Sequence, residues 1–188
     1  MIRKLEEFGT YIAMAGFKDV QIRDVKDFLN LVRKNTADVE IQVFNANLIA
    51  GWKHLYFATL NALTAFKSKL NISKSLAMEA LLYASAQGQI DKAIDLLGSK
   101  SDSPYVAVLV IAKELKAADS ALETISKLIS GDRDDCILEL TDEKIEGIKE
   151  LFDISNLELE SQLALRGLEK KALVDLVIEH VALLATQR

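Results

Sequence analysis

The run Tyr105-Val-Ala-Val-Leu-Val-Ile-Ala112 is the longest uncharged apolar stretch of the chain. A half-buried strand alternates apolar and polar residues, whereas a strand covered on both faces shows an unbroken apolar run of this kind. The run is far shorter than the roughly 18 apolar residues that cross a bilayer. Residues 105–112 are therefore expected to form a strand with other structure packed on both of its faces.

Further strands and helices are expected on either side of this run. Val39 to Phe44 alternates apolar and polar side chains, which predicts a half-buried strand. Shorter strands are expected at 10–15 and 136–140. Gly98 stands where a helix C-cap glycine is expected. Apolar residues at helical spacing predict helices at 22–34, 47–69, 76–85, 90–97 and 116–130, from Thr141, and from 156 onward with an interruption at Gly167.

One domain is expected over residues 1–188, because a single core commonly holds a chain of about this length and no linker rich in Pro, Gly or Ser divides it. Half of the residues are hydrophobic and 27% are charged, as in a folded globular protein. The pattern predicts an α/β fold (mixed α+β). We expect an about four-stranded mixed sheet surrounded by about eight helices, with a helical C-terminus.

The net charge of −5 speaks against a protein that coats nucleic acid by general electrostatics. The charge is unevenly distributed, however. Residues 1–100 carry 13 basic and 10 acidic side chains, while residues 101–188 carry 10 and 18. The stretch from Lys53 to Lys74 contains no acidic residue, so a local basic face on this acidic protein is compatible with the sequence.

The start of the chain has no apolar stretch that could form a signal peptide, and the single cysteine, Cys136, can form no internal disulfide. We therefore expect a cytoplasmic protein without a membrane partner. Cys136 lies in the apolar run Cys136-Ile-Leu-Glu-Leu140 and is expected to be a buried thiol in a strand.

Residue patterns that carry catalysis are missing from the sequence. The glycines form neither a G-x-G-x-x-G nor a G-x-x-x-x-G-K loop, and no serine stands in a G-x-S-x-G elbow. His54 and His180 lack a second ligand at metal-binding spacing, and the acidic turn around Asp132 lacks the spacing of a calcium loop. We expect no enzyme activity, no cofactor and no metal, and a protein that works by binding partners.

The most informative stretch is Asn71-Ile-Ser-Lys-Ser-Leu-Ala-Met-Glu-Ala-Leu-Leu-Tyr-Ala-Ser-Ala-Gln-Gly-Gln-Ile-Asp-Lys-Ala-Ile94. It resembles the PRPK-binding-protein family, the kinase-binding subunit of the KEOPS (EKC) complex. A weaker likeness continues through Leu168-Glu-Lys-Lys-Ala-Leu-Val-Asp-Leu176. One position departs from the family pattern Ser-Gly-Gln-Arg-Gln-Ile, because Gly88 stands in place of the arginine. That change removes a cation suited to an acidic partner or a phosphate.

The resemblance implies a non-catalytic accessory subunit of the machinery that makes threonylcarbamoyl-adenosine in tRNA. Such a subunit binds and stimulates a small atypical kinase, and in archaeal members it helps capture the CCA 3′ end of tRNA. Amphipathic helices often bind protein partners, so the kinase-binding candidates are Ile90, Ile94 and Leu97. Single-stranded RNA is held by cations and by polar groups that meet its bases, and the candidates for that role are Lys53, His54, Asn61, Lys69, Lys74, Gln87 and Gln89.

Two alternatives remain open at this point. The first is a small transferase or hydrolase whose site is assembled from distant residues, such as His54 with Glu79, and strongly shifted pKa values in a pocket around them would favour it. The second is a structural protein that self-associates through its C-terminal helices. The oligomeric state of the isolated chain stays open as well.

Overall fold

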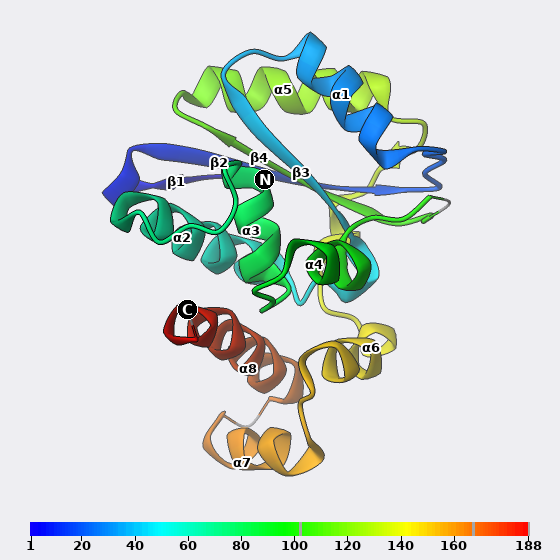
Figure 1. Cartoon of the computed structure of the whole chain (residues 1–188). Coiled ribbons are helices and arrows are strands. Elements are labelled where there is room, and N and C mark those ends of the chain that lie inside the picture. The colour runs from blue at the N-terminus through cyan, green and yellow to red at the C-terminus, as the bar shows by residue number, and fades with distance from the viewer. Residues whose placement is uncertain (102, 167, 188) are drawn as a thin grey trace.

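The computed structural model describes residues 1–101, 103–166 and 168–187, and its sheet is built around β4 (Val106–Ala112; Figure 1). β4 pairs with β2 (Thr10–Lys18) on one side and with β3 (Val39–Asn45) on the other. β1 (Ile2–Leu5) and the two-residue β5 (Asp132–Arg133) both pair with β2. Each of these pairs is antiparallel, so β2 and β3 run in the same direction with β4 between them.

Helices cover both faces of this sheet (Figure 1). α1 and α5 lie on one face and α2, α3 and α4 on the other, while α6, α7 and α8 form a further layer beyond α2. Four short 3-10 helices, η1 to η4, complete the described part of the chain. The bounds are α1 (Val25–Asn35), α2 (Trp52–Ser68), α3 (Leu76–Ala84), α4 (Ile90–Leu97), α5 (Leu115–Leu128), α6 (Asp142–Phe152), α7 (Asn156–Arg166), α8 (Glu169–Leu183), η1 (Glu6–Phe8), η2 (Ala46–Leu48), η3 (Asp135–Leu138) and η4 (Leu184–Thr186).

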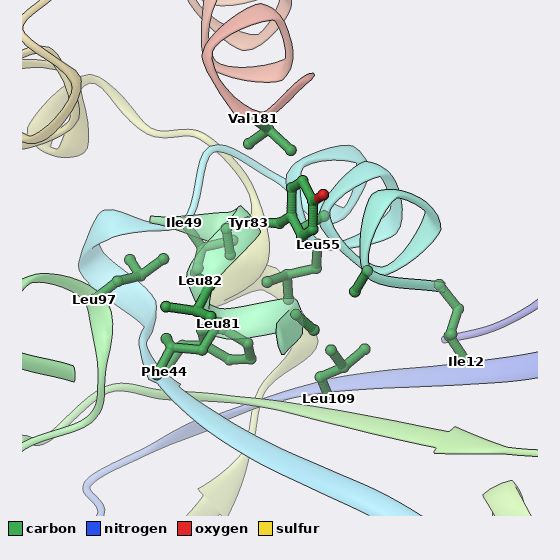
Figure 2. Close-up of a cluster of buried hydrophobic side chains, with 14 of the residues drawn as sticks. Ile12, Phe44, Ile49, Leu55, Leu81, Leu82, Tyr83, Leu97, Leu109 and Val181 are labelled. Atoms are coloured by element: carbon green, nitrogen blue, oxygen red, sulfur yellow. The ribbon is translucent and has the colours of Figure 1, made fainter. Parts of the chain in front are cut away.

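The expectation of a strand covered on both faces is confirmed, because every residue of β4 is buried. Val106, Val108 and Val110 point toward α1 and α5, whereas Leu109 and its neighbours on the other face belong to the cluster under α2 and α3. Figure 2 shows this second cluster, which Leu97 of α4 also enters. Burying each such aliphatic side chain contributes about 1.5–3 kcal/mol, so the sheet is held from both sides.

The outer helical layer is attached through aromatic contacts and α8. The ring of Phe152 in α6 lies 5.6 Å from the ring of His54 in α2 and 6.0 Å from the ring of His180 in α8, measured between centroids. Val181 of α8 points toward Tyr83 of α3 (Figure 2). The C-terminal helices therefore rest on the same α2–α3 pair that covers the sheet. None of the helices in the described residues is long and apolar enough to cross a membrane.

The predicted α/β class, the helix-covered sheet and the helical C-terminus are confirmed, and three details differ. The sheet pairs are all antiparallel, where a mixed sheet is expected. The strand expected at 136–140 is wrong: η3 occupies 135–138, because the side chain of Asp134 accepts a hydrogen bond from the Cys136 N–H at 3.1 Å and caps the turn. Cys136 is exposed rather than buried. The helix interruption expected at Gly167 lies outside the described residues.

Candidate interaction surfaces

α4 is a short helix with one buried apolar face and an exposed apolar side chain on each flank of that face. Ala93 and Leu97 are completely buried, and Leu97 points into the cluster drawn in Figure 2. Ile94 and Leu96 are 40% and 38% exposed. Ile90 is partly buried against the core. The apolar surface that α4 offers to a partner therefore consists of Ile94, Leu96 and part of Ile90.

This geometry corrects the predicted kinase-binding set. Ile90 and Ile94 reach the surface, but Leu97 has no exposed surface and belongs to the core. Leu96 is missing from the prediction. The spacing of Ile90, Ala93, Ile94 and Leu97 marks the stripe that faces the core, and Leu96 falls outside that stripe. Leu96 could have been found in the sequence as an apolar residue outside the core-facing stripe of an amphipathic helix.

The position of α4 is fixed at its C-terminal end by Gly98. The backbone of Gly98 pairs with Phe44 of β3, and its N–H donates to the Ile94 carbonyl at 3.0 Å. A Cβ atom at residue 98 would lie 2.6 Å from that carbonyl oxygen. The expected C-cap glycine is therefore confirmed in position, and it is required for this close approach. α4 presents Ile94 and Leu96 from a rigid attachment.

The lysines predicted to contact RNA lie at two ends of α2. Lys53 is in the first turn and Lys69 directly follows the last. At about 1.5 Å of rise per residue the two are about 24 Å apart along the helix axis. Lys74 lies in the loop between α2 and α3, and all three side chains are exposed. The structure therefore does not bring these lysines together into one patch.

His54 is in the core and cannot contact RNA. It has no exposed surface. Its Nδ1 accepts a hydrogen bond from the Ala50 N–H at 3.2 Å, and its Nε2 lies 2.7 Å from the Ala84 carbonyl oxygen. Because Nδ1 accepts, the proton of the neutral ring is on Nε2 and is donated to Ala84. Burial lowers the pKa of His54 to about 4.

The predicted polar contacts divide in the same way. The side-chain amide of Asn61 is partly buried and donates to the Phe57 carbonyl at 2.9 Å, so its own helix occupies it. Gln87 and Gln89 follow the end of α3, where Ala84 meets His54. They therefore lie toward the Lys53 end of α2. Gln89 is exposed and Gln87 partly buried.

A cleft of about 310 Å³ opens beside this end of α2, against the start of α8. Trp52 forms part of its wall. The guanidinium of Arg3 lies 5.3 Å from the centre of the Trp52 ring, and the ammonium group of Lys53 lies 5.9 Å from it. An aromatic face with flanking cations suits base stacking and phosphate binding. The charged residues that line the cleft are Lys53, Lys170, Lys171, Glu139 and Asp175.

The cations of the cleft differ in their pairing. Lys170 forms an ion pair with Asp142 at 2.8 Å. For Lys53 and Lys171 the described residues provide no ion pair. Neither α8 lysine is among the predicted RNA contacts, although both fall in the stretch Leu168 to Leu176 that carries part of the family resemblance. That resemblance was the signal available for them.

Comparison with known proteins places the chain in a family. The model of the family described as kinase binding protein CGI-121 matches residues 17–185. The chain belongs to this family. It is also 34% identical over 138 residues to the regulatory protein Cgi121 of Methanocaldococcus jannaschii. The aligned segment covers 73% of this chain and 85% of that protein. The family resemblance stated from the sequence is thereby confirmed.

The match to the CGI-121 family includes both surfaces described above, apart from Arg3, whose guanidinium lies by the Trp52 ring. It begins at Phe17, within β2, so β1 lies outside it. α4, the first turn of α2 and the start of α8 all fall inside. The two candidate surfaces are thus built almost entirely from the part of the chain that defines family membership.

A reaction centre at His54 and Glu79 has no support in the structure. Both side chains are completely buried, so a substrate cannot reach them. The pKa of His54 is strongly lowered, but its two ring nitrogens are occupied by backbone groups. Glu79 accepts hydrogen bonds from the N–H groups of Ile72 and Ser73 at 3.1 and 2.8 Å and holds the α2–α3 loop. Among the described residues, no group of His, Cys, Asp and Glu is arranged to hold a metal ion.

Proposed function

We propose that this protein is a regulatory subunit that binds a kinase through the exposed face of α4, without a catalytic centre of its own. Membership of a family described as kinase binding supports the partner. The name of the relative, a regulatory protein, supports the role. The observation that carries the choice of surface is that α4 leaves two large apolar side chains exposed, Ile94 on one flank of its buried face and Leu96 on the other.

The chemistry of α4 indicates what the partner surface offers. Ile94 and Leu96 need apolar contacts on the partner, and the exposed side of α4 between them carries Asp91, Lys92 and Asp95, a net charge of −1. A kinase surface with an apolar depression and flanking cations fits this helix. Because Gly98 fixes the end of α4 against β3, little ordering of the helix is needed on binding. A preorganised helix loses less entropy on association.

The test is the affinity of the double variant Ile94→Glu/Leu96→Glu for the small atypical kinase of the same organism, measured by titration calorimetry. Burying one such side chain contributes about 1.5–3 kcal/mol, so the double variant should bind at least about tenfold more weakly. Leu115→Glu is the matched control. Leu115 is 50% exposed but lies on α5, on the other side of the sheet. Unchanged affinity of the double variant would remove α4 from the interface.

We further propose that the kinase is the one of the KEOPS complex, and that the whole chain, residues 1–188, acts in the cytoplasm as one accessory domain in threonylcarbamoyl-adenosine synthesis on tRNA. The long likeness over residues 71–94 supports this assignment. The test is reconstitution of tRNA modification from the purified complex with and without this protein. Omission should lower the rate of nucleoside formation, and the Ile94→Glu/Leu96→Glu variant should not restore it. A rate that does not depend on the protein would contradict the assignment.

A second function, contact with the single-stranded CCA end of tRNA, is favoured by the cleft beside α2. Trp52 offers an aromatic ring with the cations of Arg3 and Lys53 within 6 Å of its centre, and Lys171 lines the same cleft from α8. Base stacking on an aromatic side chain contributes about 1–3 kcal/mol per base. Lys69, about 24 Å along α2 from Lys53 by the helix rise, and Lys74, in the loop after α2, do not line this cleft.

The test compares two lysine pairs. Lys53→Glu/Lys171→Glu should weaken tRNA binding and lower the slope of log affinity against log salt by about 1.4, the value for two phosphate contacts on a single strand. Lys69→Glu/Lys74→Glu is the control with the same charge change and should have little effect. tRNA that lacks CCA should bind both variants alike. A larger loss for the control pair would move the RNA site to the far end of α2.

Gly88 provides a gain-of-function test of the same idea. An added Cβ at Gly88 meets no heavy atom within 4 Å, and the residue is exposed. Gly88→Arg therefore restores the arginine of the family pattern without strain. If that arginine holds phosphate, the variant should bind tRNA several-fold more tightly at low salt, an effect that salt removes. Equal binding by both proteins would show that residue 88 plays no part.

A further inference from the structure

Lys144 is a buried lysine that neither proposed function uses. It lies in the first turn of α6 and is only 8% exposed. Its ammonium group donates to the carbonyl of Ile137 at the end of η3. Among the described residues no carboxylate pairs with it within ion-pair distance. Lysines are almost never buried unless they are paired, so this one requires an explanation.

The side chain borders the cavity between η2, η3 and α6. This cavity has a volume of about 510 Å³, and both Lys144 and Ile137 line it. The residue that carries the amine and the residue whose carbonyl accepts its hydrogen bond therefore both line the cavity. Tyr105 and Glu143 also line the cavity. Small molecules of several non-hydrogen atoms fit in this volume, which is within the usual range for ligand sites.

The protonation of Lys144 suits nucleophilic chemistry. Burial lowers its pKa to about 8, and the opposing attraction of Glu139 raises it only in part. At pH 7 about a tenth of such an amine is neutral, against roughly three in ten thousand for an ordinary lysine. Glu139 is the carboxylate that acts on the amine, and Glu143 and Tyr105 are the other ionisable residues that line the cavity. Desolvation of this kind activates lysine as a nucleophile.

We propose that Lys144 is a modification site, at which the amine is acylated by a small activated acyl compound that enters this cavity. With an acyl phosphate, the amine nitrogen attacks the carbonyl carbon and a C–N bond forms. The C–O bond to phosphorus-bound oxygen breaks, inorganic phosphate leaves with the electron pair, and the nitrogen loses a proton to water. The step needs no oxidant or reductant. The product is a neutral amide, so the buried cation is removed from the junction of η3 and α6.

The experiment treats the full chain with acetyl phosphate from pH 6 to pH 10 and measures acetylation of each lysine by peptide mass spectrometry. Lys116, exposed on α5, is the internal reference. At pH 7.5 the initial rate at Lys144 should exceed that at Lys116 at least tenfold, and it should level off above about pH 8. Glu139→Gln, which removes the carboxylate that raises the pKa, should accelerate the reaction at pH 7 several-fold. Lys144→Arg should remove the labelled peptide.

Two results would overturn the proposal. One is slower labelling of Lys144 than of Lys116 at every pH. The other is labelling of Lys144 only after unfolding in urea, which would show a structural lysine that closes the η3–α6 junction. Circular dichroism of each variant before labelling shows that the fold is retained, and the Glu139→Gln comparison does not depend on changing Lys144 itself.

Discussion

Acidification from pH 7 to pH 4 should destabilise this protein through His54. Its pKa is about 4 in the folded state and about 6.5 in an unfolded chain. Between these values the unfolded state binds the proton and the folded state does not, so stability falls as pH falls. Above about pH 6.5 the ring is neutral in both states, and His54 no longer makes stability depend on pH. The shift of about 2.5 units corresponds to a loss of about 3 kcal/mol by pH 4.

The structure gives the reason for this pKa. Nδ1 of His54 already accepts the N–H of Ala50 at 3.2 Å. A proton on Nδ1 would set two donors against each other, and the ring has no access to water. Protonation would therefore bury a charge without a partner and break a hydrogen bond without replacing it, and both changes are costly.

The assay is urea unfolding of the wild type and of His54→Gln at half-unit intervals from pH 8 to pH 4. His54→Gln lowers stability at pH 7 through lost packing on Phe152, but its pH dependence should be flatter by about 3 kcal/mol over the window. Carboxylate titration is common to both proteins. If the free energy of unfolding falls equally with pH in the wild type and in His54→Gln, His54 does not contribute to the pH dependence.

Two further predictions concern stability at neutral pH. Gly16→Ala should lower the free energy of unfolding in urea by about 1–3 kcal/mol, because a Cβ there would lie 2.5 Å from the backbone oxygen of Asp134. Gly88→Ala is the control, since a Cβ there meets open space, and it should cost less than about 1 kcal/mol. Equal losses of stability in the two variants would contradict the steric explanation. Glu79→Ala should cost about 2 kcal/mol or more by leaving the N–H groups of Ile72 and Ser73 unpaired, a prediction that wild-type stability of the variant would disprove.

The sequence predicts an element best where burial alone determines its structure. The run 105–112 has to be covered on both faces, and β4 is. β1 is not predictable in this way, because Arg3 and Lys4 interrupt the apolar pattern and the strand exists through its pairing with β2. The run 136–140 has a strand-like composition, yet the cap from Asp134 and the hydrogen bond from Gly16 N–H to Asp135 at 3.1 Å place a helical turn there.

The candidate sites show the same division. Helical spacing finds the stripe of α4 but does not state which member is fully buried, so Leu97 is included and Leu96 missed. The basic stretch from Lys53 to Lys74 looks like one patch in sequence, but α2 places Lys53 and Lys69 about 24 Å apart. The cleft instead combines Lys53 with Lys171, more than a hundred residues away. Only tertiary packing brings these two residues together.

Kinase binding through α4 can be tested by amide hydrogen exchange of this protein alone and mixed with the small atypical kinase of the same organism. Binding through α4 should slow exchange in residues 90–97 on mixing, with no change in α5 on the far side of the sheet. A stable complex that slows amide exchange in other helices and leaves exchange in residues 90–97 unchanged would show that α4 is not the kinase-binding surface.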